Sequence, residues 1–176
     1  MEFNNIVLRL VEEEDSEFIL NLRTNELKQK YISSTKNSLA EQVTWIKNYK
    51  SREKIGDEMY FIAIDENDEK FGLYRIYKIN TGLPEIGSWV SKPGYKKFTN
   101  SILLDVMIKD YVFVKLNFVR LQFEVRKENI SVNNYHKLFG PQKIGEDELN
   151  NYYILERTTF ENNVGKILKN IKKQIK

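Results

Sequence analysis

The residues best suited to chemistry lie between Arg120 and Gly140, where a strand pattern leads into a helical one. Residues 120–126 alternate polar and apolar side chains, which predicts a strand with one buried face. Asn129 follows at the turn, and His136 comes seven residues later on the predicted helix. An imidazole titrates near pH ~6.5, so His136, the only histidine of the chain, is suited to accept or donate a proton. A lone histidine on a helix is nevertheless more often a packing residue.

This spacing resembles the second half of a GNAT N-acetyltransferase, whose motif reads roughly V-x-x-x-N-x-x-A-x-x-x-Y-x-x-x-G-F. The positions that match are Val125, Asn129 and Gly140. Val132 stands at the alanine position, His136 replaces the tyrosine, and Pro141 replaces the final aromatic residue. The resemblance implies that acetyl-CoA is the cofactor. It also implies that Asn129 caps the helix or bonds the pantetheine arm of the cofactor.

The family places its tyrosine near the thioester sulfur, so the resemblance makes His136 the first candidate for the acid. An imidazolium is a stronger acid than a phenol, whose pKa is about 10. Tyr135 is the competing candidate. Successive helical residues point about 100° apart, so the two rings cannot both face one sulfur. The spacing from Asn129 favours His136.

Apolar periodicity and turn residues predict the surrounding elements. In chain order these are a strand at 6–10, a helix through Leu22, a helix after the N-cap Ser38, a hairpin of strands 59–64 and 71–79, a strand at 85–90, a helix at 100–113, the strand at 120–126, the helix of His136 and a strand at 152–155. The strands at 85–90 and 120–126 should run parallel, because a helix crosses between them. This order resembles the GNAT fold over residues 6–157. The expected class is α+β, with a mixed, mostly antiparallel sheet flanked by helices.

The resemblance implies that the cofactor contacts two segments. The family's pyrophosphate-binding turn corresponds to Lys96, Lys97, Phe98, Thr99, Asn100 and Ser101. Hydroxyl residues stand at both usual glycine positions of that turn, and its two lysines would attract phosphate. The strand that pairs with pantetheine corresponds to Trp89, Val90 and Ser91, which would contribute mostly main-chain groups. Two other interpretations stay open, a capped helix with solvated lysines and a buried Trp89.

A base is needed if the acceptor is an amine, because an ammonium of pKa near 10 is almost wholly protonated at pH 7. In many GNAT enzymes a carboxylate on the strand that starts here at Glu85 takes this role. Glu124 on the neighbouring strand is the rival. Glu85 follows Pro84, and a solvated turn residue is equally compatible with that position.

The acceptor should lie against the first two helices and the meander, where polar side chains concentrate. The candidates are Arg23, Asn25, Tyr31 and Arg75. The two arginines can grip a phosphate or carboxylate bidentately, and Tyr31 can stack on a ring. Ordinary surface ion pairs are the alternative for a chain in which 30% of residues are charged.

Composition limits the class of protein. With 176 residues, 41% of them apolar, the chain fits a single GNAT-like domain at 1–164 and a basic C-terminal helix or tail at 165–176. That tail holds five lysines and no acid, which leaves 23 basic and 25 acidic residues in 1–164. Cysteine is absent, which excludes thiolate metal sites and cysteine nucleophiles. We expect a cytoplasmic protein, with neither a membrane nor a nucleic acid as partner, no metal, and a possible homodimer.

The segments around Arg23 and Tyr31 are similar to GNAT members that acetylate nucleotide-linked amino sugars. They are less specifically similar to ribosomal-protein N-terminal acetyltransferases. The nearly neutral body favours the amino sugar, because it lacks an acidic surface to attract basic ribosomal tails. A GNAT-like binding module with weak or no catalysis is the non-enzyme alternative, motivated by the glycine-free phosphate turn.

Overall fold

The computed structural model of the protein describes residues 2–3 and 5–174. These residues form one eight-stranded sheet of order β1-β2-β3-β4-β5-β6-β8-β7. Its strands are β1 (Glu2–Phe3), β2 (Ile6–Leu10), β3 (Met59–Ile64), β4 (Lys70–Tyr77), β5 (Glu85–Ser91), β6 (Arg120–Arg126), β7 (Gln142–Glu146) and β8 (Asn150–Glu156). The α-helices are α1 (Ser16–Arg23), α2 (Leu39–Lys54), α3 (Phe98–Asp110), α4 (Ile130–Lys137) and α5 (Arg157–Gln174). Single turns of 3₁₀-helix occur at Glu13–Asp15, Gln29–Tyr31 and Ile79–Thr81, and a π-helical turn, Tyr111–Lys115, extends α3.

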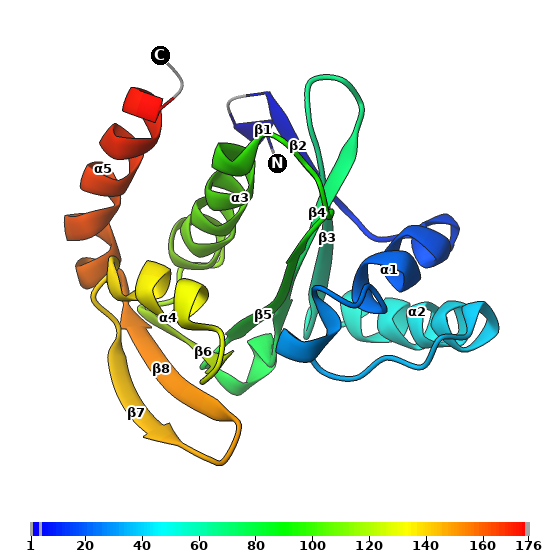
Figure 1. Ribbon diagram of the computed structural model, residues 1–176. Helices are drawn as coiled ribbons and strands as arrows, with labels where there is room; N and C mark the ends of the chain where they lie inside the picture. The colour runs from blue at the N-terminus through cyan, green and yellow to red at the C-terminus, as the bar shows by residue number, and fades with distance from the viewer. Residues whose placement is uncertain (1, 4, 175–176) are drawn as a thin grey trace.

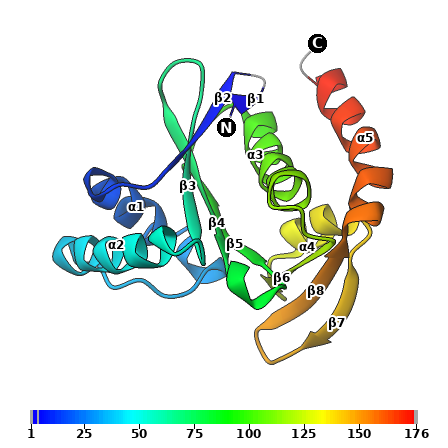
Figure 2. The ribbon, with the colours of Figure 1, turned by 180° about the vertical axis from the view of Figure 1, so that it is seen from behind.

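The helices cover the two faces of the sheet in separate groups (Figure 1). α1 and α2 lie on one face, and α3, α4 and α5 lie on the other, with α5 beside the hairpin of β7 and β8 in the reverse view (Figure 2). All strand pairs are antiparallel except β5 with β6. The predicted α+β class with a mixed, mostly antiparallel sheet is therefore confirmed.

Most predicted elements are confirmed at their predicted places. Ser38 is the N-cap of α2, because its Oγ accepts a hydrogen bond of 3.3 Å from the N–H of Glu41. The sequence reading missed β7, whose five side chains are all exposed, so that no apolar periodicity marks it. It also missed β1, and it placed the terminal helix or tail at 165–176, whereas α5 begins at Arg157. Residues 175 and 176 of that predicted tail lie outside the described residues.

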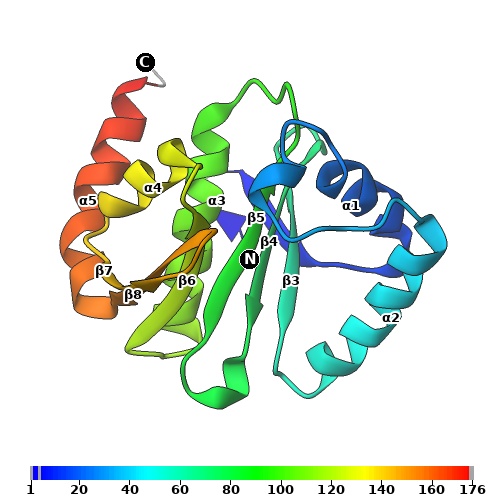
Figure 3. The ribbon, with the colours of Figure 1, turned by 60° about the horizontal axis from the view of Figure 1, so that its bottom comes forward.

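The strands β5 and β6 are joined at one end and separate along their length (Figure 3). Glu85 and Gln122 form their one registered pair among the described residues, and the N–H of Gln122 donates to the carbonyl of Pro84 at 2.9 Å. On its other edge, β5 pairs with β4, where a bulge follows Leu73. Ser88 lies in this bulge with a left-handed φ of 51°. The bulge and the separation give the sheet an opening beside Ser88.

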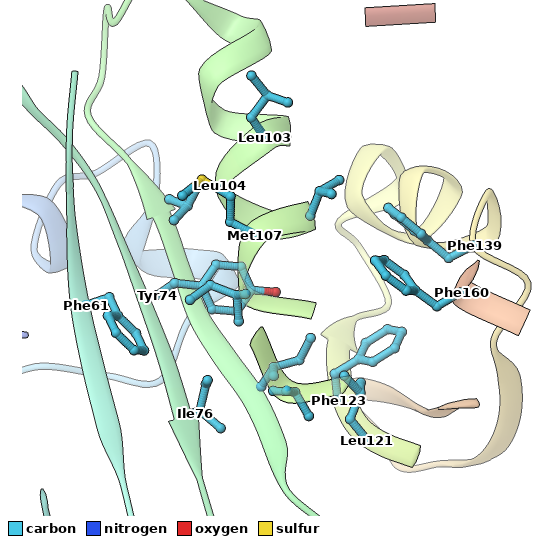
Figure 4. Packing of buried hydrophobic residues seen from close by; sticks show 14 of the residues in the cluster. Phe61, Tyr74, Ile76, Leu103, Leu104, Met107, Leu121, Phe123, Phe139 and Phe160 are labelled. Atoms are coloured by element: carbon cyan, nitrogen blue, oxygen red, sulfur yellow. The ribbon is translucent and has the colours of Figure 1, made fainter. Parts of the chain in front are cut away.

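The larger core lies on the face that α3, α4 and α5 cover (Figure 4). Phe139, after α4, stacks on Phe160 of α5 with ring centroids 5.9 Å apart. Burying one such side chain stabilises the fold by about 1.5–3 kcal/mol. α3 packs so closely on β4 that a Cβ at Gly72 would lie 2.8 Å from Leu104 Cδ2. This tight packing fixes α3 and α4 beside the separated strands.

Candidate active site

Two pockets meet at Ser88 of β5. The first, which we call the gap pocket, encloses about 440 Å³ between the separated strands β5 and β6. The second, which we call the arginine pocket, encloses about 260 Å³ between β3–β5 and the chain around α1 and α2. Ser88 lines both of them. Ser88 is the one described residue that the two linings share.

Strands, turns and helices all contribute to the gap pocket. Its lining from the strands consists of Tyr74 of β4, Ile86–Ser91 of β5 and Phe123–Arg126 of β6. Pro93, Gly94 and Tyr95 line it from the turn after β5, and Phe98 and Ser101 line it from the start of α3. Asn129 and His136 line it from the side of α4. Sequence reasoning predicted Trp89, Val90, Ser91, Phe98, Ser101, Asn129 and His136 among these residues.

Lys97 corrects the expectation of two free lysines at the phosphate turn. Its Nζ lies 2.8 Å from Asp65 Oδ2 and 2.8 Å from Glu66 Oε1. These hydrogen bonds raise the pKa of Lys97. Its charge is neutralised by the two carboxylates in the turn between β3 and β4. Lys96 is exposed, and of the two only Lys96 lacks a carboxylate partner among the described residues. Neither lysine lines the gap pocket.

The rest of the predicted phosphate turn divides in the same way. Thr99 does not line the gap pocket, and Asn100 Nδ2 donates to the Tyr95 hydroxyl at 2.8 Å. Sequence reasoning missed Gly94, which lines the pocket with a φ of 74° that favours glycine. Its signal in the sequence is the Pro93-Gly94 pair, which marks a turn after the strand at 85–90.

Asn129 has the role expected of a helix cap. Its Oδ1 accepts a hydrogen bond of 3.3 Å from the N–H of Val132, at the start of α4. Trp89 is half-buried, and its ring lies 5.3 Å from that of Tyr135 and 5.7 Å from that of His136. The Trp89 indole is thus both a packing residue and part of the gap pocket wall.

His136 lines the gap pocket and is only 5% exposed. Its Nδ1 lies 3.4 Å from Lys109 Nζ, and its ring packs on Phe123 with centroids 4.6 Å apart. Burial, together with the Lys109 charge, lowers the pKa of His136 to about 3. The structure therefore corrects the expected imidazolium, because the ring is neutral at pH 7.

Tyr135, the competing acid candidate, faces a different group. Its hydroxyl donates to Asp105 Oδ2 at 2.6 Å, and it does not line the gap pocket. Burial and the Asp105 charge raise the pKa of Tyr135 well above its usual value. The two rings diverge as expected for neighbouring helical residues, and His136 is the one that faces the gap pocket.

The two candidate carboxylates lie in unlike surroundings. Glu85 bonds to Tyr77 Oη, to Lys78 Nζ at 2.7 Å and to Gln122 Nε2 at 3.1 Å. Its side chain is 12% exposed and lines neither pocket. Glu124 is exposed and lines the gap pocket, and burial of part of its carboxyl together with the Glu85 charge raises its pKa. Only Glu124 is accessible from the gap pocket.

The arginine pocket brings Arg23 and Arg75 together, as the sequence predicted. Arg23 donates to Thr35 Oγ1 at 2.7 Å, to Ser33 Oγ at 2.8 Å and to Ser88 Oγ at 3.3 Å. All the hydrogen-bond partners of Arg23 among the described residues are uncharged. The Tyr60 hydroxyl, buried at the same pocket, has no hydrogen-bond partner in the described part of the chain.

Arg75 differs from Arg23 because its charge is already matched. It forms a salt bridge with Glu58 and lies over the rings of Trp45 and Tyr77, each 4.9 Å from its guanidinium carbon. Asn25 lines neither pocket, and its Oδ1 accepts a hydrogen bond from the N–H of Leu27 at 3.1 Å. Tyr31 lines the gap pocket rather than the arginine pocket.

Two searches of the described residues found nothing. No cluster of three or more His, Asp or Glu side chains that would suit a metal ion occurs in residues 2–3 and 5–174. Within the same residues, no helix has the length and apolar character needed to cross a membrane.

Comparisons with known proteins show which proteins this chain is similar to. The family model described as an acetyltransferase (GNAT) domain matches residues 5–140. The solved structure of apo FdhC, described as a nucleotide-linked sugar GNAT, is 35% identical with a TM-score of 0.82, and the match covers 94% of each chain. No curated protein sequence matches this chain.

More distant structures share the fold. Spermidine N-acetyltransferase from Vibrio cholerae, solved with CoA and spermine, is 21% identical with a TM-score of 0.76, over 90% of this chain and 99% of that one. A dodecameric structure of the Vibrio cholerae enzyme is 20% identical with a TM-score of 0.69, over 91% and 98%.

Proposed function

Because this chain belongs to the GNAT acetyltransferase family, we propose that it transfers the acetyl group of acetyl-CoA to the amine of a nucleotide-linked amino sugar. The family assignment makes the chain an N-acetyltransferase and sets aside the binding-module alternative. The observation that carries the substrate class is Arg23, a cation with uncharged partners in a pocket that touches the gap pocket at Ser88. The cytoplasmic location and the homodimer expected from the sequence stay predictions.

The gap pocket fits the arm of acetyl-CoA. β5 and β6 pair at Glu85 and Gln122, so beyond that point their facing edges have main-chain groups that an amide-containing arm can bond. Gly94, Phe98 and Ser101 would hold the cofactor near the start of α3, where helix N–H groups favour phosphate. Acetyl-CoA would supply an acyl thioester there.

The acceptor would approach from the arginine pocket. A diphosphate suits Arg23, because a guanidinium without a carboxylate partner gains charge-assisted hydrogen bonds from phosphate oxygens. A phosphate or hydroxyl oxygen would also satisfy the buried Tyr60 hydroxyl. A polyamine is disfavoured, since Glu41, the acid in the lining, lies 3.3 Å from Lys36.

Glu124 is the better proposed base than Glu85. The acceptor ammonium must lose a proton before its nitrogen can attack, and Glu124 is open to the gap pocket while Glu85 is held by three neighbours. The raised pKa of Glu124 makes its carboxylate a stronger base than an ordinary glutamate. A Glu124→Gln variant should lose more turnover at pH 7 than Glu85→Gln.

A panel of acceptors tests the substrate class. Purified protein with acetyl-CoA is assayed with a nucleotide-diphospho amino sugar, the same sugar without the nucleotide, spermidine, and a peptide with a free N-terminus. We expect kcat/KM for the nucleotide-linked sugar to exceed that for the free sugar by about 10- to 150-fold. One charge-assisted contact of about 1.5–3 kcal/mol gives that ratio. Equal values for the two sugars, or a preference for spermidine or the peptide, would contradict the proposal.

A further inference from the structure

A buried charged cluster lies behind the gap pocket wall, on α3 and α4. Lys109 and Asp105 are both 0% exposed and form a salt bridge one helical turn apart on α3. The Tyr74 hydroxyl donates to Asp105 Oδ1 at 2.6 Å, and the Tyr135 hydroxyl donates to Asp105 Oδ2 at 2.6 Å. Burying an ion pair costs desolvation free energy that apolar side chains would not require. A role toward the histidine beside it, the only one of the chain, would account for that cost.

Lys109 is surrounded by groups that suit an ammonium. Its Nζ contacts the Asp105 carboxylate and His136 Nδ1, and it lies 4.3 Å from the centre of the Phe139 ring. Burial lowers the pKa of Lys109, and the Asp105 charge opposes that loss. Burial raises the pKa of Asp105, but the Lys109 charge brings it below its usual value. The carboxylate is thus the group that opposes loss of the proton from the buried ammonium.

An ammonium has three donors and no acceptor, so the His136 nitrogen that it contacts must present a lone pair. A neutral imidazole carries one proton, which then stands on Nε2. No hydrogen bond of Nε2 is found among the described residues, and Nε2 is not one of their buried atoms without a partner. Nε2 is therefore open to the gap pocket, which His136 lines.

We propose that Lys109 is a positioning residue, whose buried ammonium donates to His136 Nδ1 and holds the neutral ring with its Nε2–H directed into the gap pocket. Trp89, Tyr135 and Phe123 pack around the ring and fix its plane. From there Nε2–H would donate a hydrogen bond to the departing sulfur and keep its own proton. This last role depends on the proposed function, whereas the tautomer does not.

Because His136 is the only histidine of the chain, its tautomer can be tested directly. Selective ¹⁵N-histidine labelling gives signals from one ring only, and the shifts of its two nitrogens report which one carries the proton. In wild-type protein at pH 7 we expect a neutral ring with the proton on Nε2. A proton on Nδ1, a mixture of tautomers, or an imidazolium would overturn the proposal. This measurement needs no variant and no acceptor, so it is independent of the substrate class.

A Lys109→Met variant tests the causal step. Without the ammonium, and with Asp105 left as a nearby anion, the ring should take up a proton closer to neutral pH or populate the Nδ1–H tautomer. We expect kcat to fall by about 10- to 100-fold, since losing one aligned donor costs about 100- to 1000-fold and the ring would keep part of that alignment. The KM for acetyl-CoA should stay the same. Lys115→Met, which removes an exposed lysine from the π-helical turn after α3, is the matched control.

Stability is measured in parallel, because Lys109→Met leaves a buried carboxylate unpaired. If that variant does not fold, the Asp105→Leu/Lys109→Met double variant removes both charges. The tautomer of His136 and kcat are then measured in the double variant. An unchanged tautomer and unchanged kcat in a folded variant would show that Lys109 only stabilises the fold.

Discussion

Charged side chains on the two faces of β5 differ in whether an opposite charge pairs with them. On the α3 and α4 face, Lys109 and Asp105 are wholly buried, and each charge is matched by the other. On the α1 and α2 face, Arg23 is half-buried, and its bonds go to hydroxyl and carbonyl oxygens. A matched pair can hold a neighbouring ring in place but attracts no ion. An unmatched guanidinium at a pocket is suited to an ion that arrives from solution.

The difference separates positioning from binding. Changes in the buried cluster should appear mainly in stability and in kcat, because its groups are not accessible to a ligand. Changes at Arg23 should appear mainly in the KM for the acceptor. Four changes test the two regions and the residues between them, beginning with the largest expected effect and ending with the smallest.

The largest effect is expected from breaking the buried ion pair. Asp105→Leu leaves the Lys109 ammonium unpaired and should lower the free energy of unfolding by about 3–5 kcal/mol. The Asp105→Leu/Lys109→Met double variant should recover at least about 1 kcal/mol of that loss, because no charge is left buried. Urea unfolding measures both. Additive losses would mean that the two charges do not stabilise each other.

Arg23→Gln should raise the KM for the nucleotide-linked acceptor by about 10- to 100-fold, since a hydrogen bond to a charged group is worth about 1.5–3 kcal/mol. The KM for acetyl-CoA should not change. Arg52→Gln is the matched control, because Arg52 pairs with Glu58 beside Arg75 but does not line the arginine pocket. Steady-state kinetics decides. If both substitutions raised the KM for the acceptor equally, Arg23 would act only through the general surface charge.

The buried ring should also make stability depend on pH. Unfolded His136 titrates near pH ~6.5 and the folded ring has a pKa of about 3, so between these values the unfolded state binds the extra proton. Stability should therefore fall as pH drops through this window, by about 1.4 kcal/mol per pH unit from this group, with no contribution above pH ~6.5. A His136→Gln variant should lack this slope. If the free energy of unfolding changed equally with pH in the two proteins between pH 4 and 6, the depressed pKa would be contradicted.

The smallest effect is expected at the junction of the two regions. Ser88 has a φ of 51°, which costs a residue with a Cβ about 1 kcal/mol or more. Ser88→Gly should relieve this strain and raise the free energy of unfolding by about 0.5 kcal/mol, after the greater entropy of unfolded glycine. Ser88→Ala keeps the strain while removing the hydroxyl, and thermal unfolding separates the two. A loss of stability in Ser88→Gly would mean that the hydroxyl matters more than the backbone.

Local patterns were enough to predict most of the fold. The Ser38 cap, the hairpin of β3 and β4, and the Asn129 cap of α4 depend on neighbours in the chain, and the structure confirms them. β7 was missed because its exposed side chains carry no periodic signal. The start of α5 at Arg157 was missed because only residues 165–176 were assigned to a terminal helix or tail.

The candidate site was less predictable, because its charges are set by partners distant in the sequence. Lys97 was expected to attract phosphate, and Asp65 on the β3–β4 turn neutralises it. Lys109 carried no functional signal within its apolar helix, yet it lies against a ring 27 residues away.

By itself, the sequence determined which residues could do chemistry: one histidine, no cysteine, and an asparagine placed to start the helix that bears the imidazole. Only the tertiary structure decided the state of those residues. The charge of a side chain depends on burial and on the groups that packing brings beside it. Those groups come from strands and helices whose meeting no local pattern records.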